Sequence, residues 1–206
     1  MILQAILEGL FWGGSFALSI GPSLFSLLET SSKRGFKSGL ALAFGIFLSD
    51  IFCVVLAYVG VAQLFNDSKN KTYISLLGGA ILIGFGLFSI LHKKKIEEEK
   101  GLEIQAVNAP LYIVKGFFLN VLNPAVILLW IIYVGKISSN VGYTPNLIIL
   151  SFIITLGFVF FTDVLKAYYS NKISQRLSHT VLRKFNLLLG VILVITGMVF
   201  IYKALF

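Results

Sequence analysis

Six long apolar runs, separated by short segments that carry most of the charges, constrain this chain more than any other feature. The runs cover 4–29, 38–63, 73–92, 111–136, 145–168 and 185–205. A helix needs about 20 predominantly apolar residues to cross the hydrocarbon core of a bilayer. The runs are too long, and alternate too little, for membrane-spanning strands. The pattern therefore predicts an all-α membrane protein with six transmembrane helices.

The composition is that of a protein dissolved in lipid. Hydrophobic residues make up 57% of the chain and charged residues 13%, against about 45–50% and about 25% in soluble domains. In a soluble protein the net charge of +8 would point to nucleic acid. Here the basic residues lie between the apolar runs, so attraction to an anionic membrane surface accounts for them better. We expect membrane lipid, and no nucleic acid, as a partner.

The basic residues are unevenly divided between the two sides of the membrane. Thirteen of the 17 lie in or beside the first, third and fifth loops, and the remaining four are Lys69, Lys71, Lys136 and Lys203. Cytoplasmic loops are enriched in Lys and Arg. The first, third and fifth loops are therefore predicted to be cytoplasmic and both termini extracytoplasmic.

Two of the runs contain helix breakers near their middle. Gly21-Pro22 interrupts the first run and Asn123-Pro124 the fourth. A proline inside a helix removes one backbone hydrogen bond and clashes with the preceding turn. At membrane depth such a break is tolerated only where protein buries it or where it lines a wet cavity. Breaks at corresponding places in two halves are the best sequence indication of a transport site.

The two halves of the chain also match each other. With an offset of 111 residues, six residues of the third run have identical counterparts in the sixth: Leu76, Leu77, Gly79, Ile81, Leu82 and Gly86. A unit of three spans used twice places the second copy upside down in the membrane, as in many transporters. We expect one transmembrane transporter domain over 1–206, made of repeat one (1–92), a charged cytoplasmic loop (93–110) and repeat two (111–206). Ala80 and Gly84 are expected to form a small-residue face for helix contact.

Asp50 is the sharpest candidate for a functional residue. It lies twelve residues into the second run, which places it ~18 Å from the cytoplasmic end of a helix and close to the midplane. An ionised carboxylate is costly there and is a functional hypothesis by default. A coupling proton or a substrate's ammonium group would neutralise it. The alternative is a hydrogen-bonded aspartate that only holds helices together.

Polar side chains flank both breaks. Asn120 and Asn123 can hold freed backbone groups or the amino and carboxylate groups of a substrate, because an amide both donates and accepts. Ser19 and Ser23 flank the first break in the same way. The N-terminus of the half-helix after such a break would attract a carboxylate. The alternative is a simple proline kink that neighbouring helices satisfy.

Three further sets of residues are interpreted more simply. Asp163, in the fifth run, is a secondary candidate, since an i, i+3 ion pair with Lys166 would neutralise it. Trp12, Trp130 and Tyr133 are expected at lipid-facing or interfacial positions. His92 and His179 have no second ligand at metal spacing, and no nucleophile elbow, zinc-protease motif or phosphate loop is present. We expect no metal site, no cofactor and no enzymatic activity.

At the level of motifs, the chain resembles the LysE/RhtB family of amino-acid exporters over essentially its full length. The motifs that carry the resemblance are Gly21-Pro22, a basic loop, Gly39, Gly45, Asp50 and Asn120-x-x-Asn123-Pro124. The resemblance implies a bacterial inner-membrane exporter of amino acids or related metabolites, driven by the proton-motive force.

Three positions depart from the usual family pattern. Ile20 stands where the family commonly has proline, Ser49 where it usually has glycine, and Ala125 where lysine often follows the Asn-Pro pair. The missing lysine removes one candidate partner for a carboxylate, so a substrate other than a basic or neutral amino acid stays open.

The resulting interpretation is a secondary exporter that works by alternating access, with a central site shaped by the two breaks and by Asp50. One alternative is a cation or metal exporter of similar architecture, which would need more intramembrane acids, thiols or imidazoles than two aspartates and Cys53. Another is a non-transporting membrane assembly partner, which would explain the spans but not the paired breaks. The choice between a monomer and a homo-oligomer is open.

Overall fold

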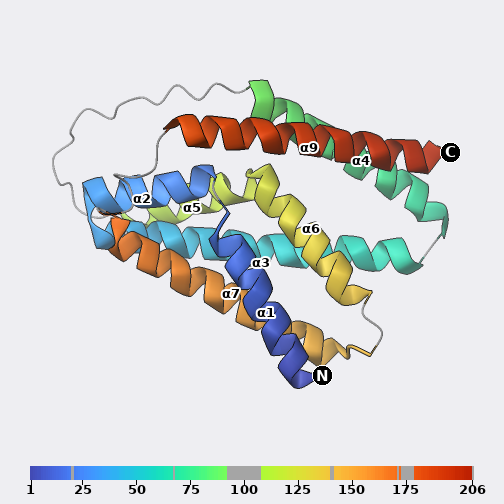
Figure 1. Ribbon diagram of the computed structural model, residues 1–206, viewed down its shortest axis with the longest axis horizontal. Coiled ribbons are helices and arrows are strands. Elements are labelled where there is room, and N and C mark those ends of the chain that lie inside the picture. Colours follow the sequence, from blue (N-terminus) through green and yellow to red (C-terminus); the bar gives the residue numbers. More distant parts are fainter. Residues whose placement is uncertain are drawn as a thin grey trace.

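The computed structural model describes residues 1–19, 21–66, 68–91, 108–139, 142–170, 172 and 179–205 (Figure 1). Within these ranges it contains eight α-helices and no strand, which confirms the predicted all-α class. The helices are α1 (Ile2–Ala17), α2 (Pro22–Arg34), α3 (Phe36–Asn66), α4 (Ser68–Leu91), α5 (Ala109–Val121), α6 (Pro124–Ser138), α7 (Pro145–Tyr168) and α9 (His179–Leu205).

Two of the expected spans are bent pairs of shorter helices. The axes of α1 and α2 differ by 71°, and those of α5 and α6 by 65°. The chain changes direction where the sequence places Gly21-Pro22 and Asn123-Pro124. Neither α1–α2 nor α5–α6 can therefore be a straight transmembrane helix.

Proline determines where these half-helices begin. All four prolines of the chain lie in the first turn of a helix, at the starts of α2, α5, α6 and α7. The fixed φ of proline suits this position, and its missing N–H costs nothing there. The residue before a proline is disfavoured in helical geometry, so the preceding helix must end first.

By length and apolar composition, α3 and α7 can each cross a membrane, and the bent pairs bring the candidate spans to as many as four. The expected runs at 73–92 and 185–205 correspond to α4 and α9, where the described residues include a shorter apolar helix at Gly190–Tyr202. The full set of six spans therefore stays a prediction. Most of the charged loop expected at 93–110 lies outside the described residues.

Helices α4 and α9 run side by side as one pair, which Figure 1 shows at the edge of the molecule. Four glycines form their contact. A Cβ atom on Gly79 would lie 2.7 Å from the Gly197 carbonyl oxygen, and one on Gly86 would lie 2.7 Å from the Gly190 carbonyl oxygen. Higher residue numbers on one helix meet lower numbers on the other, so the pair is antiparallel.

The small-residue face expected at Ala80 and Gly84 is wrong. Ala80 is exposed, and a Cβ atom on Gly84 would meet nothing within 4 Å. The contact face of α4 runs through Gly79 and Gly86 instead, one residue away from the expected face. These two glycines are seven residues apart, which is about two turns, so they lie on the same side of the helix.

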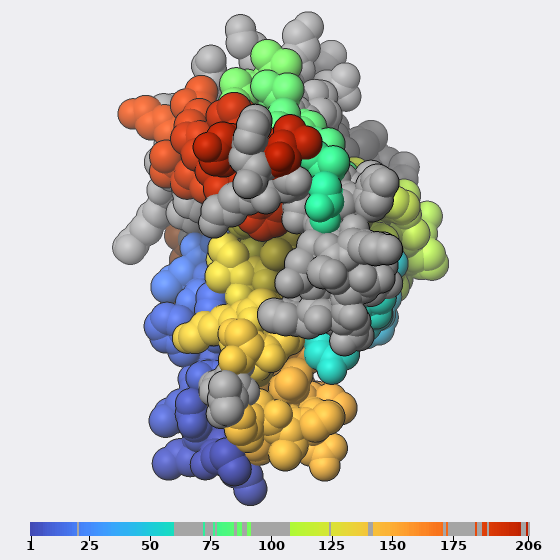
Figure 2. Space-filling model, turned by 90° about the vertical axis from the view of Figure 1, so that its right-hand side faces the viewer, coloured from blue at the N-terminus to red at the C-terminus, as the bar shows by residue number. Residues whose placement is uncertain are grey.

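The half-helices pack against the long helices in a crossed pattern. Gly45 of α3 faces the backbone of Ile113 in α5, and Gly116 of α5 faces the backbone of Leu42 in α3. In the other pair, α1 lies on α7, where a Cβ atom on Gly13 would stand 2.9 Å from Phe158 Cβ. Figure 2 shows α6 in yellow between the α4–α9 pair and the ends of α1 and α7.

The glycine contact between α4 and α9 leads to a matched pair of substitutions. Gly86→Ala places a methyl group against backbone, and overpacking of this kind costs about 1–3 kcal/mol. Gly84→Ala meets open space and should be neutral, or stabilising by up to about 1 kcal/mol through helix propensity. The melting temperature of the detergent-solubilised Gly86→Ala variant should therefore fall, whereas that of the Gly84→Ala variant should stay the same or rise. Equal melting temperatures would contradict the close contact.

Candidate functional site

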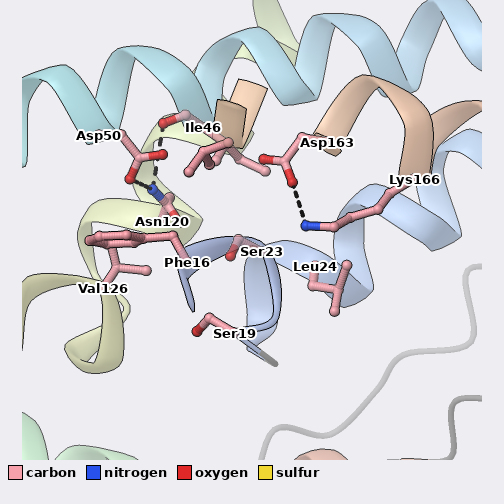
Figure 3. A pocket seen from close by; sticks show the side chains of 11 residues that line it. Phe16, Ser19, Ser23, Leu24, Ile46, Asp50, Asn120, Val126, Asp163 and Lys166 are labelled. Carbon is pink, nitrogen blue, oxygen red and sulfur yellow. Dashed lines mark hydrogen bonds and ion pairs between the residues drawn. The ribbon is translucent and has the colours of Figure 1, made fainter. Parts of the chain in front are cut away.

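A small cavity lies where the first break, α5 and the long helices α3 and α7 come together (Figure 3). Its volume is about 30 Å³, which is room for one or two water molecules and too little for an amino acid. The lining residues are Phe16, Ser19, Ser23, Leu24, Ile46, Asp50, Asn120, Val126, Val159, Asp163 and Lys166.

Asp50 reaches this cavity from the middle of α3 and is only 3% exposed. Its carboxylate is held by two donors from the second broken span. Asn120 Nδ2 in α5 donates to Oδ1 at 2.8 Å, and Trp130 Nε1 in α6 donates to the same oxygen at 3.1 Å. Since both hydrogen bonds end on Oδ1, Oδ2 is the oxygen that a ligand could use.

Trp130 is a site residue that the sequence interpretation placed wrongly. It and Tyr133 were expected at the lipid or the interface, yet both are 0% exposed. Trp130 packs on Phe16 with ring centroids 4.4 Å apart. Besides Ala125 in its first turn, the buried residues of α6 follow a helical stripe, namely Val126, Trp130, Tyr133, Val134 and Ile137. The helical spacing of these residues could have indicated that Trp130 and Tyr133 are buried. In a helix that is apolar on every side, however, such spacing does not show which face meets protein.

The two breaks contact each other through Gly21 and Asn123. A Cβ atom on Gly21 would lie 2.5 Å from Asn123 Nδ2, so no larger residue fits there without movement. The other end of the same amide serves the backbone: Asn123 Oδ1 accepts a hydrogen bond from Ala125 N at 3.1 Å. Asn123 therefore caps the start of α6 and does not line the cavity.

The first break starts α2 without such a cap. Gly21 is the N-cap residue of α2, and among the described residues no side chain caps the helix. The first N–H groups of a helix have no intrahelical partners, and they carry a partial positive charge. Ser23 and Leu24 belong to this turn and line the cavity, so the start of α2 can accept a carboxylate.

Asp163 and Lys166 bring a second charged pair to the cavity from α7. Their ion pair, expected from the i, i+3 spacing, is present with Lys166 Nζ 2.8 Å from Asp163 Oδ1. The side chains of Asp163 and Lys166 are 9% and 19% exposed. The cavity is therefore lined by two carboxylates, those of Asp50 and Asp163, and by the ammonium group of Lys166 (Figure 3). The formal charge of the described lining is −1 when both aspartates are ionised.

A buried hydroxyl cluster closes the packing between α6, α7 and α1. Tyr133 Oη lies 2.7 Å from Ser151 Oγ and 3.0 Å from Thr155 Oγ1. Ser151 and Thr155 donate to the backbone carbonyls of Ala5 and Gly9, each at 3.1 Å. These hydrogen bonds join α1 to α7, whereas the ring contact of Phe16 with Trp130 joins α1 to α6.

The predicted site residues thus separate into two groups. The cavity brings together Ser19, Ser23, Asp50, Asn120 and Asp163. Gly21 and Asn123 shape the breaks and are not among the described residues that line the cavity, and Pro124 starts α6. Among the described residues, no group of three or more His, Cys, Asp or Glu side chains could hold a metal ion.

A polar cavity between broken apolar helices is typical of membrane transporters. The chain belongs to the LysE type translocator family, whose sequence model matches residues 14–204. It is therefore a transporter of the membrane and not an enzyme.

Three relatives illustrate the similarity within this family. The leucine efflux protein of Klebsiella pneumoniae is 25% identical over 68% of this chain and 66% of its own length. The putative amino acid efflux protein of Bacillus subtilis is 23% identical over 98% of both chains. An uncharacterized membrane protein of Pseudomonas aeruginosa is 28% identical over 77% of this chain and 78% of its own length. No solved structure matches the chain significantly.

The two tryptophans of the chain offer a test of the hydrogen bond to Asp50. Trp130→Phe removes a donor to a buried carboxylate, whereas Trp12→Phe removes a buried indole N–H that has no hydrogen-bond partner among the described residues. We expect Trp130→Phe to lower the free energy of unfolding by roughly 1–3 kcal/mol more than Trp12→Phe does. Titration with a denaturing detergent measures this difference. Equal losses would mean that the Trp130 donor does not stabilise Asp50.

Proposed function

We propose that the protein exports amino acids or related small metabolites across the bacterial inner membrane. One observation carries this proposal: a membrane-embedded carboxylate, Asp50, meets both broken spans at a single polar cavity. Intramembrane acids of this kind typically belong to substrate or proton pathways. The names of the relatives, which are a leucine efflux protein and a putative amino acid efflux protein, support the substrate class. No observation of comparable weight favours a cation exporter or an assembly partner.

The proposed architecture is one domain over 1–206, built from two inverted repeats of three spans. The glycines support it, because Gly79 and Gly86 have Gly190 and Gly197 as counterparts in the repeat. In the α4–α9 contact Gly79 meets Gly197 and Gly86 meets Gly190. A twofold axis that exchanges the two repeats produces such reciprocal contacts. The packing of α1 on α7 and of α5 on α3 has the same reciprocity.

In this proposal each end of a zwitterion has its own partner. The ammonium group, or a coupling proton in its place, binds Oδ2 of Asp50, while Asn120 and Trp130 hold Oδ1. The carboxylate lies toward the uncapped start of α2, where Ser23 adds a hydroxyl donor. A proton and an ammonium group compete for one oxygen, so inward proton flow can release the substrate outside.

Transport requires the cavity to enlarge, because its present volume of about 30 Å³ excludes an amino acid. We propose alternating access in which the half-helices pivot at the two breaks while the long helices stay whole. The breaks are suited to this, since each joins two rigid helices through only a few residues. The secondary candidate Asp163 would change its environment with the movement of α1 and α2 over α7.

The role of Asp50 is tested by Asp50→Asn in proteoliposomes that carry an imposed pH gradient. The amide keeps the shape of the side chain but neither ionises nor binds a proton. We expect pH-driven leucine efflux to fall by about 100-fold or more, the usual contribution of a positioned proton-transfer group.

Glu29→Gln is a suitable control for this experiment. Glu29 pairs with Lys33 at 2.8 Å on an exposed part of α2, away from the cavity. Leucine efflux by the Glu29→Gln variant should therefore stay close to that of the wild type. Wild-type efflux by the Asp50→Asn variant would remove Asp50 from the mechanism.

The proposed orientation, with both termini extracytoplasmic, can be tested by cysteine labelling. Cys53 is the single cysteine and is buried, so Cys53→Ala provides a background without thiols. In that background an impermeant maleimide added to intact spheroplasts should label a Ser139→Cys variant. It should label a Lys37→Cys variant only after lysis. Both positions are exposed, and the opposite pattern would reverse the topology.

A further inference from the structure

We infer that Lys166 recognises the carboxylate group of the transported molecule while it keeps its ion pair with Asp163. The inference rests on the proposed function, because it assigns the partner at the second end of a substrate whose ammonium group binds Asp50. It restricts the cargo to molecules that carry a free carboxylate.

The position of Lys166 is the first argument. Its side chain lines the cavity and is 19% exposed, although it lies within a helix that is apolar enough to cross a membrane. Figure 3 shows Lys166 extending from α7 toward the cavity. An ammonium group has three N–H donors, and the 2.8 Å contact with Asp163 uses one of them. The others can serve a ligand without loss of the ion pair.

The charges around the cavity are the second argument. Among the described lining residues, Asp50 and Asp163 are acidic and Lys166 is the one cation. A substrate carboxylate that enters beside two aspartates meets repulsion, which is strong where water is excluded. The substrate can bind with its carboxylate in the cavity only if a cation offsets this repulsion, and Lys166 is the residue in place to do so.

The start of α2 is the third and independent argument. Ser23 and Leu24 line the same cavity, and they lie in the first turn of α2, which has no side-chain cap from the part of the chain that the structure describes. The corresponding helix after the second break, α6, is capped by its own Asn123. The backbone donors of the first break are therefore the ones left for a ligand. A carboxylate between Lys166 and this turn receives donors from both.

The competing explanation is that Lys166 only neutralises Asp163. The two explanations differ in what a substitution does to selectivity. If Lys166 only balances the charge of Asp163, removing both charges together leaves the preference for leucine over leucinamide unchanged. If it recognises a carboxylate, its loss weakens leucine and leaves leucinamide, which has the same side chain and ammonium group but no carboxylate, unaffected.

The experiment measures the dissociation constants of leucine and leucinamide by calorimetry on the purified full-length protein at pH 6.5, where leucinamide is mostly cationic. We expect the wild type to prefer leucine, and Lys166→Gln to weaken leucine binding by about tenfold or more, the worth of a charge-assisted hydrogen bond. Leucinamide binding should not weaken, because leucinamide has no carboxylate for Lys166 to hold and a more negative cavity attracts its ammonium group. Lys166→Arg, which keeps the charge, should retain the preference.

Lys166→Gln leaves Asp163 without its partner, so that variant can fail to fold. The double variant Lys166→Gln/Asp163→Asn removes both charges together, keeps the formal charge of the cavity and should also lose the preference. Lys115→Gln, at an exposed position on α5, is the matched control and should keep it.

The possible outcomes separate the inference from the proposed function. A preference for leucine that survives in the double variant, or a parallel loss of both ligands, overturns the inference and leaves the exporter proposal intact. A wild type that binds neither leucine nor any of the other nineteen amino acids in the same assay overturns both.

Discussion

The structure depends on one constraint, which is that backbone groups freed inside a membrane must find partners within the protein. Proline at the start of α2 and of α6 frees such groups in two spans. At the second break Asn123 provides a partner: its Oδ1 caps the start of α6, and its Nδ2 packs against Gly21. At the first break no side chain of a described residue caps α2, and the cavity lies beside the start of that helix. The cavity thus lies at the break whose following helix is uncapped, and not at the break that Asn123 caps.

Asp50 connects this backbone arrangement to the packing of whole helices. Its two donors come from the half-helices on either side of the second break, so the carboxylate on α3 ties α5 and α6 to one point. The close glycine contacts between α3 and α5 hold α5 against the same helix that carries Asp50.

Several features could be predicted from the sequence because they depend on local chemistry. The all-α class, the proline breaks and the ion pair of Asp163 with Lys166 follow from hydropathy, proline geometry and spacing along one helix. The contact face of α4 and the positions of Trp130 and Tyr133 could not be predicted in this way. In lipid every face of a helix is apolar, so hydropathy does not distinguish a face that meets lipid from one that meets protein.

The sequence by itself determined that the chain belongs in a membrane, where its apolar runs break and which acids lie inside those runs, because these follow from residue order and from the solvation cost of each group. Only the tertiary structure decided which polar groups meet. It brought Asn120 and Trp130 to Asp50, set Asn123 aside as a cap, and placed Asp163 and Lys166 beside the first break. The physical reason is that these contacts join segments about 70 to 140 residues apart, whose register is set by glycine packing between helices and not by any local signal.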